Sequence, residues 1–339
     1  MKRSVSEPRY IEYEELFGSK DWRPDSLLLG NGFSIGANPN FGYGNLYEAV
    51  RSELTEPQLA LFQNVGDFNF EQVLRSLDTT LATLECYKAK NTTQIFGDRD
   101  SIRLALINAV RSSHIADAAA LSEVQKLKCA EFLKPYRRVF TTNYDFLLYW
   151  VLLFAKEQSR GTGLLHDGFF SKDPAGSFAA LEPFDGIRYL RGALHLFVRG
   201  GFEFKRTYAP MNGSLLSQVE TGMMNGEYPL FVSESTADKK RRHIRQSHYL
   251  EECYTNLHSC RGTMVVFGNR LADNDDHIRR AIARSSVTRL CVGLLGGEGS
   301  PDDVALRHSI LEIQEHRWAT NKPQIEFLFY DSSKADPWA

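Results

Sequence analysis

A short apolar run that stops at glycine is the most informative feature of this 339-residue chain. The run, Ser26–Gly30, is too short for a helix and is typical of a buried parallel strand that meets a nucleotide-binding turn. Glycines in such a turn let the backbone adopt positive φ and approach a phosphate closely. We therefore predict that backbone N–H groups of this turn bind a phosphate. The turn consists of Gly30, Asn31, Gly32, Phe33 and Ser34.

Further strand candidates follow this run, and segments with helical periodicity separate most of them. Strands separated by helices predict an α/β fold, here a Rossmann-like doubly wound parallel sheet. The strand candidates are Arg138–Thr141, Ile187–Leu190, Pro229–Val232, Thr263–Gly268, Thr288–Leu295 and Gln324–Tyr330. The helices expected between or after them are Phe146–Ala155, Ala237–Arg245, Tyr249–His258, Asp276–Arg284 and Asp302–His316.

The region between the first two strand candidates is helical in character. Phe70, Val73, Leu74 and Leu77 recur at i, i+3, i+4 and i+7, which is the spacing of one helix face. We interpret residues 46–135 as a helical insertion in one domain that covers residues 26–332. Residues 1–25 are expected to form an N-terminal arm with a short helix, and residues 333–339 a C-terminal tail.

Composition narrows the functional class. Apolar residues make up 42% of the chain and charged residues 24%, as in soluble globular proteins. The net charge of −2 provides no long-range attraction to nucleic acid or to an anionic membrane. None of the five cysteines forms a Cys-x-x-Cys pair, which favours reduced thiols in the cytoplasm and no zinc site. We expect no membrane segment, because the longest apolar stretch has about 10 residues and a span needs about 20.

Two polar residues follow the strand candidate Arg138–Thr141. Asn143 and Asp145 lie at its carboxyl end, where open α/β sheets bind ligands. An asparagine at this place orients a water or a ribose hydroxyl, and an aspartate accepts hydrogen bonds from a ribose. The alternatives are structural: Asn143 is a turn residue, and Asp145 caps the following helix.

Four segments in this order resemble the motifs of the sirtuin-like superfamily. They are the turn Gly30–Ser34, the box Thr141-Thr142-Asn143-Tyr144-Asp145, the pair Arg191-Gly192, and the strand end Val265–Arg270 with Gly268 and Asn269. The details are most similar to a bacterial branch of uncharacterised and phage-defence proteins. That branch lacks the zinc module of the protein deacylases, as does this chain.

The resemblance implies that the protein hydrolyses NAD to nicotinamide and ADP-ribose without a metal. It implies that Asn143 orients the water or the ribose, that Asp145 holds the ribose side, and that Gly268 and Asn269 bind the cofactor. No sensor domain is evident in the sequence. Activation would then depend on self-assembly into a homo-oligomer or on a partner protein.

One residue departs from the family pattern. Arg191 stands where the family has its catalytic histidine, and an arginine stays protonated and cannot act as a general base. His195 and His166 are the alternative catalytic candidates, although His195 also suits a core position. If residues 187–197 formed one strand, Arg191 and His195 would lie about 13 Å apart. The departure favours a second reading, in which the protein binds NAD or ADP-ribose without cleaving it and Arg191 clamps a phosphate or a carboxylate.

Two charged segments have open interpretations. The basic run Lys239–Arg245 is typical of a solvated helix face, and the alternative is contact with nucleic acid or an acidic partner. The segment Gly268–His277 is rich in aspartate and asparagine but lacks the glycine and distal glutamate of an EF-hand. We interpret it as a helix N-cap with a ribose-binding loop.

Overall fold

A computed structural model gives the fold of the chain. The structure describes residues 7–18, 23–38, 46–66, 70–113, 118–158, 166–169, 176–179, 185–199, 201–209, 212–232 and 237–339. The Gly/Asn/Pro-rich segment 39–45 lies outside the described residues. Within the described part, none of the helices has both the length and the apolar composition that a membrane span requires.

The core of the protein is a seven-stranded parallel sheet with the order β1-β10-β9-β8-β2-β3-β4. Numbered along the chain without the short edge strand β1, its six other strands have the order 3-2-1-4-5-6 that characterises dinucleotide-binding folds. This confirms the Rossmann-like, doubly wound α/β fold. The strands are β1 (Arg9–Tyr10), β2 (Ser26–Leu29), β3 (Arg138–Thr141), β4 (Gly186–Tyr189), β8 (Arg261–Phe267), β9 (Ser286–Leu294) and β10 (Glu326–Asp331).

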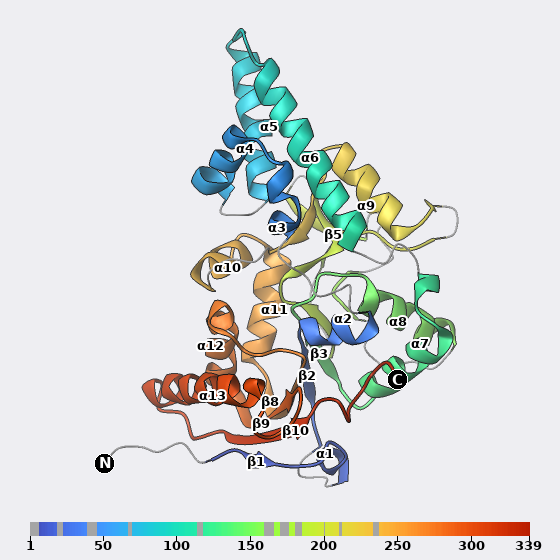
Figure 1. Cartoon of the computed structure of the whole chain (residues 1–339), viewed down its shortest axis with the longest axis vertical. Helices are drawn as coiled ribbons and strands as arrows, with labels where there is room; N and C mark the ends of the chain where they lie inside the picture. Colours follow the sequence, from blue (N-terminus) through green and yellow to red (C-terminus); the bar gives the residue numbers. More distant parts are fainter. Residues whose placement is uncertain are drawn as a thin grey trace.

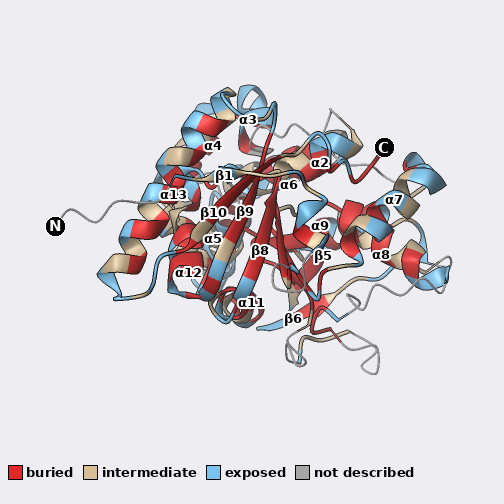
Figure 2. Ribbon diagram, turned by 90° about the horizontal axis from the view of Figure 1, so that it is seen from below, coloured by how far each residue is buried: buried red, intermediate tan, exposed pale blue. Residues whose placement is uncertain are grey.

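The strands are apolar because helices cover both faces of the sheet. All four residues of β2 are buried, and so are all four of β3. Figure 2 shows the buried strands between α12 and α13 on one side and α7 and α8 on the other. The helices that follow the sheet strands are α2 (Asn31–Ala37), α8 (Leu147–Glu157), α11 (His248–His258), α12 (Asp276–Arg284) and α13 (Pro301–Ala319).

The insertion between β2 and β3 is helical, as expected. Its hairpin of α5 and α6 projects away from the sheet (Figure 1). Phe70, Val73, Leu74 and Leu77 of α5 are all buried, so the spacing identified the packed face of this helix. The insertion contains α3 (Leu46–Val50), α4 (Glu56–Leu61), α5 (Phe70–Cys86), α6 (Thr93–Ser113) and α7 (Glu123–Leu133).

A second, antiparallel sheet corrects one expectation. Pro229–Val232, expected in the parallel sheet, contributes a strand that pairs antiparallel with β5. The chain leaves the parallel sheet at Gly192, where φ is +74° and an added Cβ would overlap the carbonyl of Leu230. Residues 187–197 are therefore two strands in two sheets. The elements of this region are β5 (Gly192–Arg199), β6 (Phe202–Lys205), α9 (Leu215–Met224), β7 (Pro229–Phe231) and α10 (Ala237–Ile244).

Both ends of the chain pack on the parallel sheet. Arg9 and Tyr10 form β1, which extends the sheet beside β10, and the short helix α1 (Glu15–Gly18) follows. At the other end, Ala335 and Trp338 are buried. The C-terminal residues therefore form part of the packed structure.

Candidate functional site

A cavity of about 690 Å³ lies along the carboxyl edge of the parallel sheet. Residues at the ends of six strands line it, from β10 across β9, β8, β2 and β3 to β4. These strand ends span five inter-strand spacings, which is about 24 Å. The centre of the cavity is the gap between β2 and β8, where the strand order reverses. The volume and this position are those of a ligand site in a doubly wound fold.

The glycines of the first turn serve a close backbone contact. Gly32 N–H donates to the Gly268 carbonyl at 2.9 Å, and an added Cβ at Gly32 would lie 2.7 Å from the Gly268 Cα. Gly268 itself has a φ of +65°. Phe33 N–H donates to the Gly30 carbonyl at 3.0 Å. With the Gly30 N–H, which donates to the Phe267 carbonyl at 2.9 Å, three of the amides expected to bind phosphate are used within the protein. Of the five turn residues, Asn31 and Gly32 line the cavity.

Asn143, Ser34 and Asp145 form a hydrogen-bonded support beneath this turn. Asn143 Nδ2 donates to the Gly30 carbonyl and to Ser34 Oγ, both at 2.9 Å. Ser34 Oγ donates to Asp145 Oδ2 at 2.5 Å, and Leu147 N–H donates to Asp145 Oδ1 at 2.9 Å. These side chains do not line the cavity. The structure brings the predicted residues together, but their contacts hold the turn against β3 and the start of α8.

A buried ion cluster forms one wall of the cavity. Arg191, which follows β4, makes an ion pair with Asp275, and the Lys240 ammonium lies 3.3 Å from the same carboxylate. The exposed fractions of the three side chains are 8%, 9% and 0%. Arg191 and Asp275 line the cavity, and Lys240 contacts Asp275 without lining it.

Electrostatics keep this cluster ionised. Burial opposes ionisation of Asp275, but the charges of Arg191 and Lys240 outweigh it and lower the pKa of the carboxyl to about 2. The neighbouring His277 is buried, and burial lowers its pKa to about 4, so it is neutral at pH 7. At neutral pH the ionised Asp275 therefore pairs with Arg191 at the cavity, where a guanidinium suits an anionic ligand.

The two histidines considered for catalysis lie away from the cavity. His195 is fully buried in β5 among Phe146, Tyr149 and Tyr189. His166 is exposed, and its carbonyl accepts the Ile187 N–H at 2.9 Å, at the amino end of β4. Neither lines the cavity, because the turn at Gly192 carries β5 into the antiparallel sheet and residue 166 lies at the opposite sheet edge.

We predict that His195→Phe makes the protein less sensitive to acid. Burial, with the charge of Lys205, lowers the pKa of His195 to about 3, whereas an unfolded histidine titrates near 6.5. Its contribution to stability is present above pH 6.5 and is lost as the pH falls from 6.5 toward 3. At pH 5 the loss is about 2 kcal/mol. Urea unfolding at pH 7.5 and 5.0 measures it, and an equal pH dependence in wild type and variant would contradict this prediction.

The loop after β8 places Asp275 at the cavity. Asn269 Oδ1 accepts the Leu271 N–H at 2.7 Å, and a 3₁₀ turn at Asp273–Asp275 precedes α12. Gly268 and Asn269 line the cavity, as the sequence predicted, but Asp275 and Lys240 were not singled out. The burial of Lys240 could have been inferred from its i, i+4 spacing to Ile244, because these two are the buried residues of α10.

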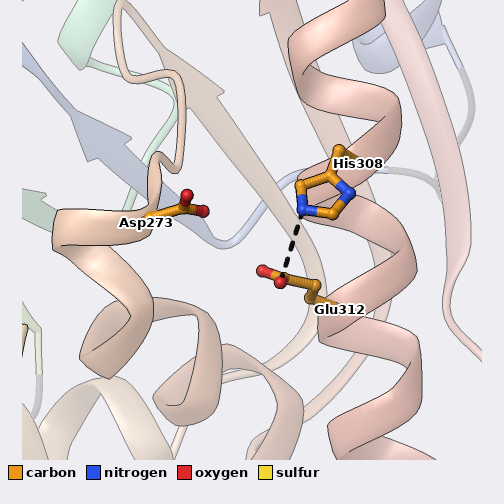
Figure 3. Close-up of side chains that lie close together, drawn as sticks. All are labelled: Asp273, His308 and Glu312. Atoms are coloured by element: carbon orange, nitrogen blue, oxygen red, sulfur yellow. Dashed lines mark ion pairs between the residues drawn. The ribbon is translucent and has the colours of Figure 1, made fainter.

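Another group of charged side chains has the composition of a metal site. Asp273, His308 and Glu312 lie together, with the two α13 side chains facing the loop (Figure 3). The guanidinium of Arg279 already lies among them, 3.1 Å from Asp273 and 2.5 Å from Glu312. Both carboxylates thus pair with Arg279, and His308 contacts Glu312 at 3.5 Å, so ion pairs account for the group without a metal.

Sequence comparison assigns the chain to a family whose description gives no activity. No curated protein matches the chain. One family matches residues 27–338, from β2 to the C-terminal tryptophan, which is most of the chain. The chain therefore belongs to the family described as Domain of unknown function (DUF4917).

Proposed function

We propose that this protein binds NAD or ADP-ribose along the carboxyl edge of its parallel sheet. The observation that carries the proposal is the buried guanidinium of Arg191, which is paired with Asp275 and lines a cavity at the switch point of the sheet. A diphosphate supplies the complementary charge, and an arginine is suited to bind its oxygens in pairs. The length of the cavity suits an extended dinucleotide better than a mononucleotide.

Apolar side chains at the same cavity favour a ligand with a flat ring. Ile35 and Leu295 line it and are 39% and 65% exposed. Exposed aliphatic side chains at a cavity offer a surface on which an adenine or nicotinamide ring packs. The cavity thus combines a cationic wall with apolar contacts, as a nucleotide requires.

NAD hydrolysis is the second candidate activity. Breaking the bond between nicotinamide and ribose develops positive charge on the ribose, and the ionised carboxylate of Asp275 lines the cavity. The carboxylate is already paired with two cations, and none of the described residues that line the cavity is a histidine. A positioned general base contributes about 10²–10⁴-fold to a rate. We therefore expect cleavage, if it occurs, to be slow.

Two further properties belong to this proposal. All five cysteines are free thiols, which favours a reducing compartment such as the cytoplasm. Activation by self-assembly or by a partner protein, and a role in defence against phage, rest on the sirtuin-like resemblance. Nucleic acid is not proposed as a partner, because two side chains of the basic run are paired within the protein: Lys240 with Asp275 and Arg241 with Glu251.

Calorimetric titration with NAD and with ADP-ribose tests the binding proposal, and nicotinamide release over several hours tests hydrolysis. We expect both ligands to bind without added metal, and nicotinamide to appear slowly or not at all. The absence of heat with either ligand at millimolar concentration would refute binding. Rapid nicotinamide release would indicate that hydrolysis, and not binding alone, is the main function.

A further inference from the structure

The C-terminal segment Ser332–Ala339 contributes directly to the cavity wall. Of the 20 residues that line the cavity, four come from this segment and four from α2. The two segments, some 300 positions apart in the sequence, thus supply eight of 20 lining residues. The four from the C-terminal segment are Ser332, Ser333, Asp336 and Pro337.

Trp338 joins this segment to α2. Its indole ring packs on Phe33 with ring centroids 4.8 Å apart, and its Nε1–H donates to the Phe33 carbonyl at 2.7 Å. Gly36 makes room for the indole, because an added Cβ would lie 3.0 Å from Trp338 Cδ1. Trp338 is 4% exposed although it is the penultimate residue. The contact therefore buries a large ring directly under the glycine turn.

The same tryptophan orients a residue that faces the cavity. Trp338 N–H donates to Asp336 Oδ1 at 2.8 Å, which folds the chain between a lining residue and the buried ring. On its other side, Lys334–Asp336 borders a second hollow of about 370 Å³. Tyr13, Phe17 and Phe132 form part of the wall of that hollow. Because the C-terminal segment has a hollow on each side, its position depends on the contacts that attach it to the rest of the protein.

We propose that Trp338 is a positioning residue for the ligand cavity, which holds the C-terminal segment and the α2 turn in the arrangement that receives an anionic dinucleotide. This inference rests on the proposed function. When the four lining residues are already held in place, ligand binding carries no entropic cost for ordering them. Without the indole, binding has to order the segment, and affinity falls.

Calorimetric titration with ADP-ribose tests this role in wild type and three variants. We expect Trp338→Leu to bind about tenfold more weakly or worse, since each ordered side chain weakens binding. Trp338→Phe keeps the ring packing without the N–H donor, so its affinity should be intermediate. Trp318→Phe, at a half-buried site on α13, is the matched control and should bind as wild type.

Hydrogen exchange of residues 332–339 distinguishes a positioning role of Trp338 from a purely stabilising one. In Trp338→Leu we expect fast exchange of this segment that slows when ADP-ribose is added. If Trp338 had a purely structural role, Trp338→Leu would lower the melting temperature and leave affinity and ligand-dependent exchange unchanged. That result would overturn this inference and leave the proposed function standing. Trp338→Phe supplies the same comparison if the leucine variant does not fold. Absence of binding to wild type would overturn the proposed function, and the role of Trp338 with it.

Discussion

Asp275→Asn is expected to lower the free energy of unfolding by about 3–5 kcal/mol, because it removes an anion that two buried cations contact. Arg191 and Lys240 both face this carboxylate, and none of the three side chains is more than 9% exposed. The loss of one partner from a buried ion cluster is more damaging than the loss of a surface pair, since the remaining charges keep their desolvation penalty. Denaturant unfolding at pH 7 measures the change.

A neighbouring aspartate provides the control for this variant. Asp273 lies in the same loop and pairs with Arg279, but its side chain is 85% exposed. Asp273→Asn should therefore change stability by less than about 1 kcal/mol. Because the pKa of Asp275 is lowered to about 2, its ionised form stabilises the fold above about pH 4, and that contribution is lost as the pH falls toward 2. An Asp275→Asn protein as stable as wild type would refute the assignment of the cluster.

Arg191→Gln should weaken the binding of NAD and of ADP-ribose about ten- to hundredfold, since a hydrogen bond to a charged group contributes about 1.5–3 kcal/mol. Glutamine keeps much of the length of the side chain and removes the charge of the guanidinium, while Asp275 keeps its contact with Lys240. Calorimetric titration of the folded variant measures the loss.

Arg270→Gln is the matched control for Arg191→Gln. Arg270 also lines the cavity, but it is 68% exposed and paired with Asp302 at 3.0 Å. An exposed, paired arginine contributes little, so the affinity should change by less than about threefold. Equal affinities of wild type and Arg191→Gln would mean that the cationic wall does not bind the ligand.

Much of the fold was predictable because parallel strands have a strong local signal. The four residues of β2, three of them leucines, are all buried, and the glycine after them marks the switch point. The antiparallel sheet was not predictable in the same way. Residues 187–197 form one mostly apolar run, and only the positive φ at Gly192, imposed by contact with Leu230, divides it between two sheets.

The site was predictable in position and less so in its chemistry. Asn143 and Asp145 lie where the strand pattern places them, but their hydrogen bonds to the turn and to α8 depend on packing that the sequence does not display. Lys240 lies in a basic run that is typical of a solvated face. Its burial depends on Asp275, 35 positions further along the chain. The role of Trp338 likewise depends on its contact with Phe33, which lies near the other end of the sequence.

A crystal structure of the protein with ADP-ribose tests the central claim most directly. The account predicts a ligand that extends along the carboxyl ends of the parallel strands, with the diphosphate within hydrogen-bond distance of the Arg191 guanidinium and a ring against Ile35 or Leu295. A ligand bound elsewhere, or a diphosphate turned away from Arg191 while Arg191 keeps its pairing with Asp275, would contradict it.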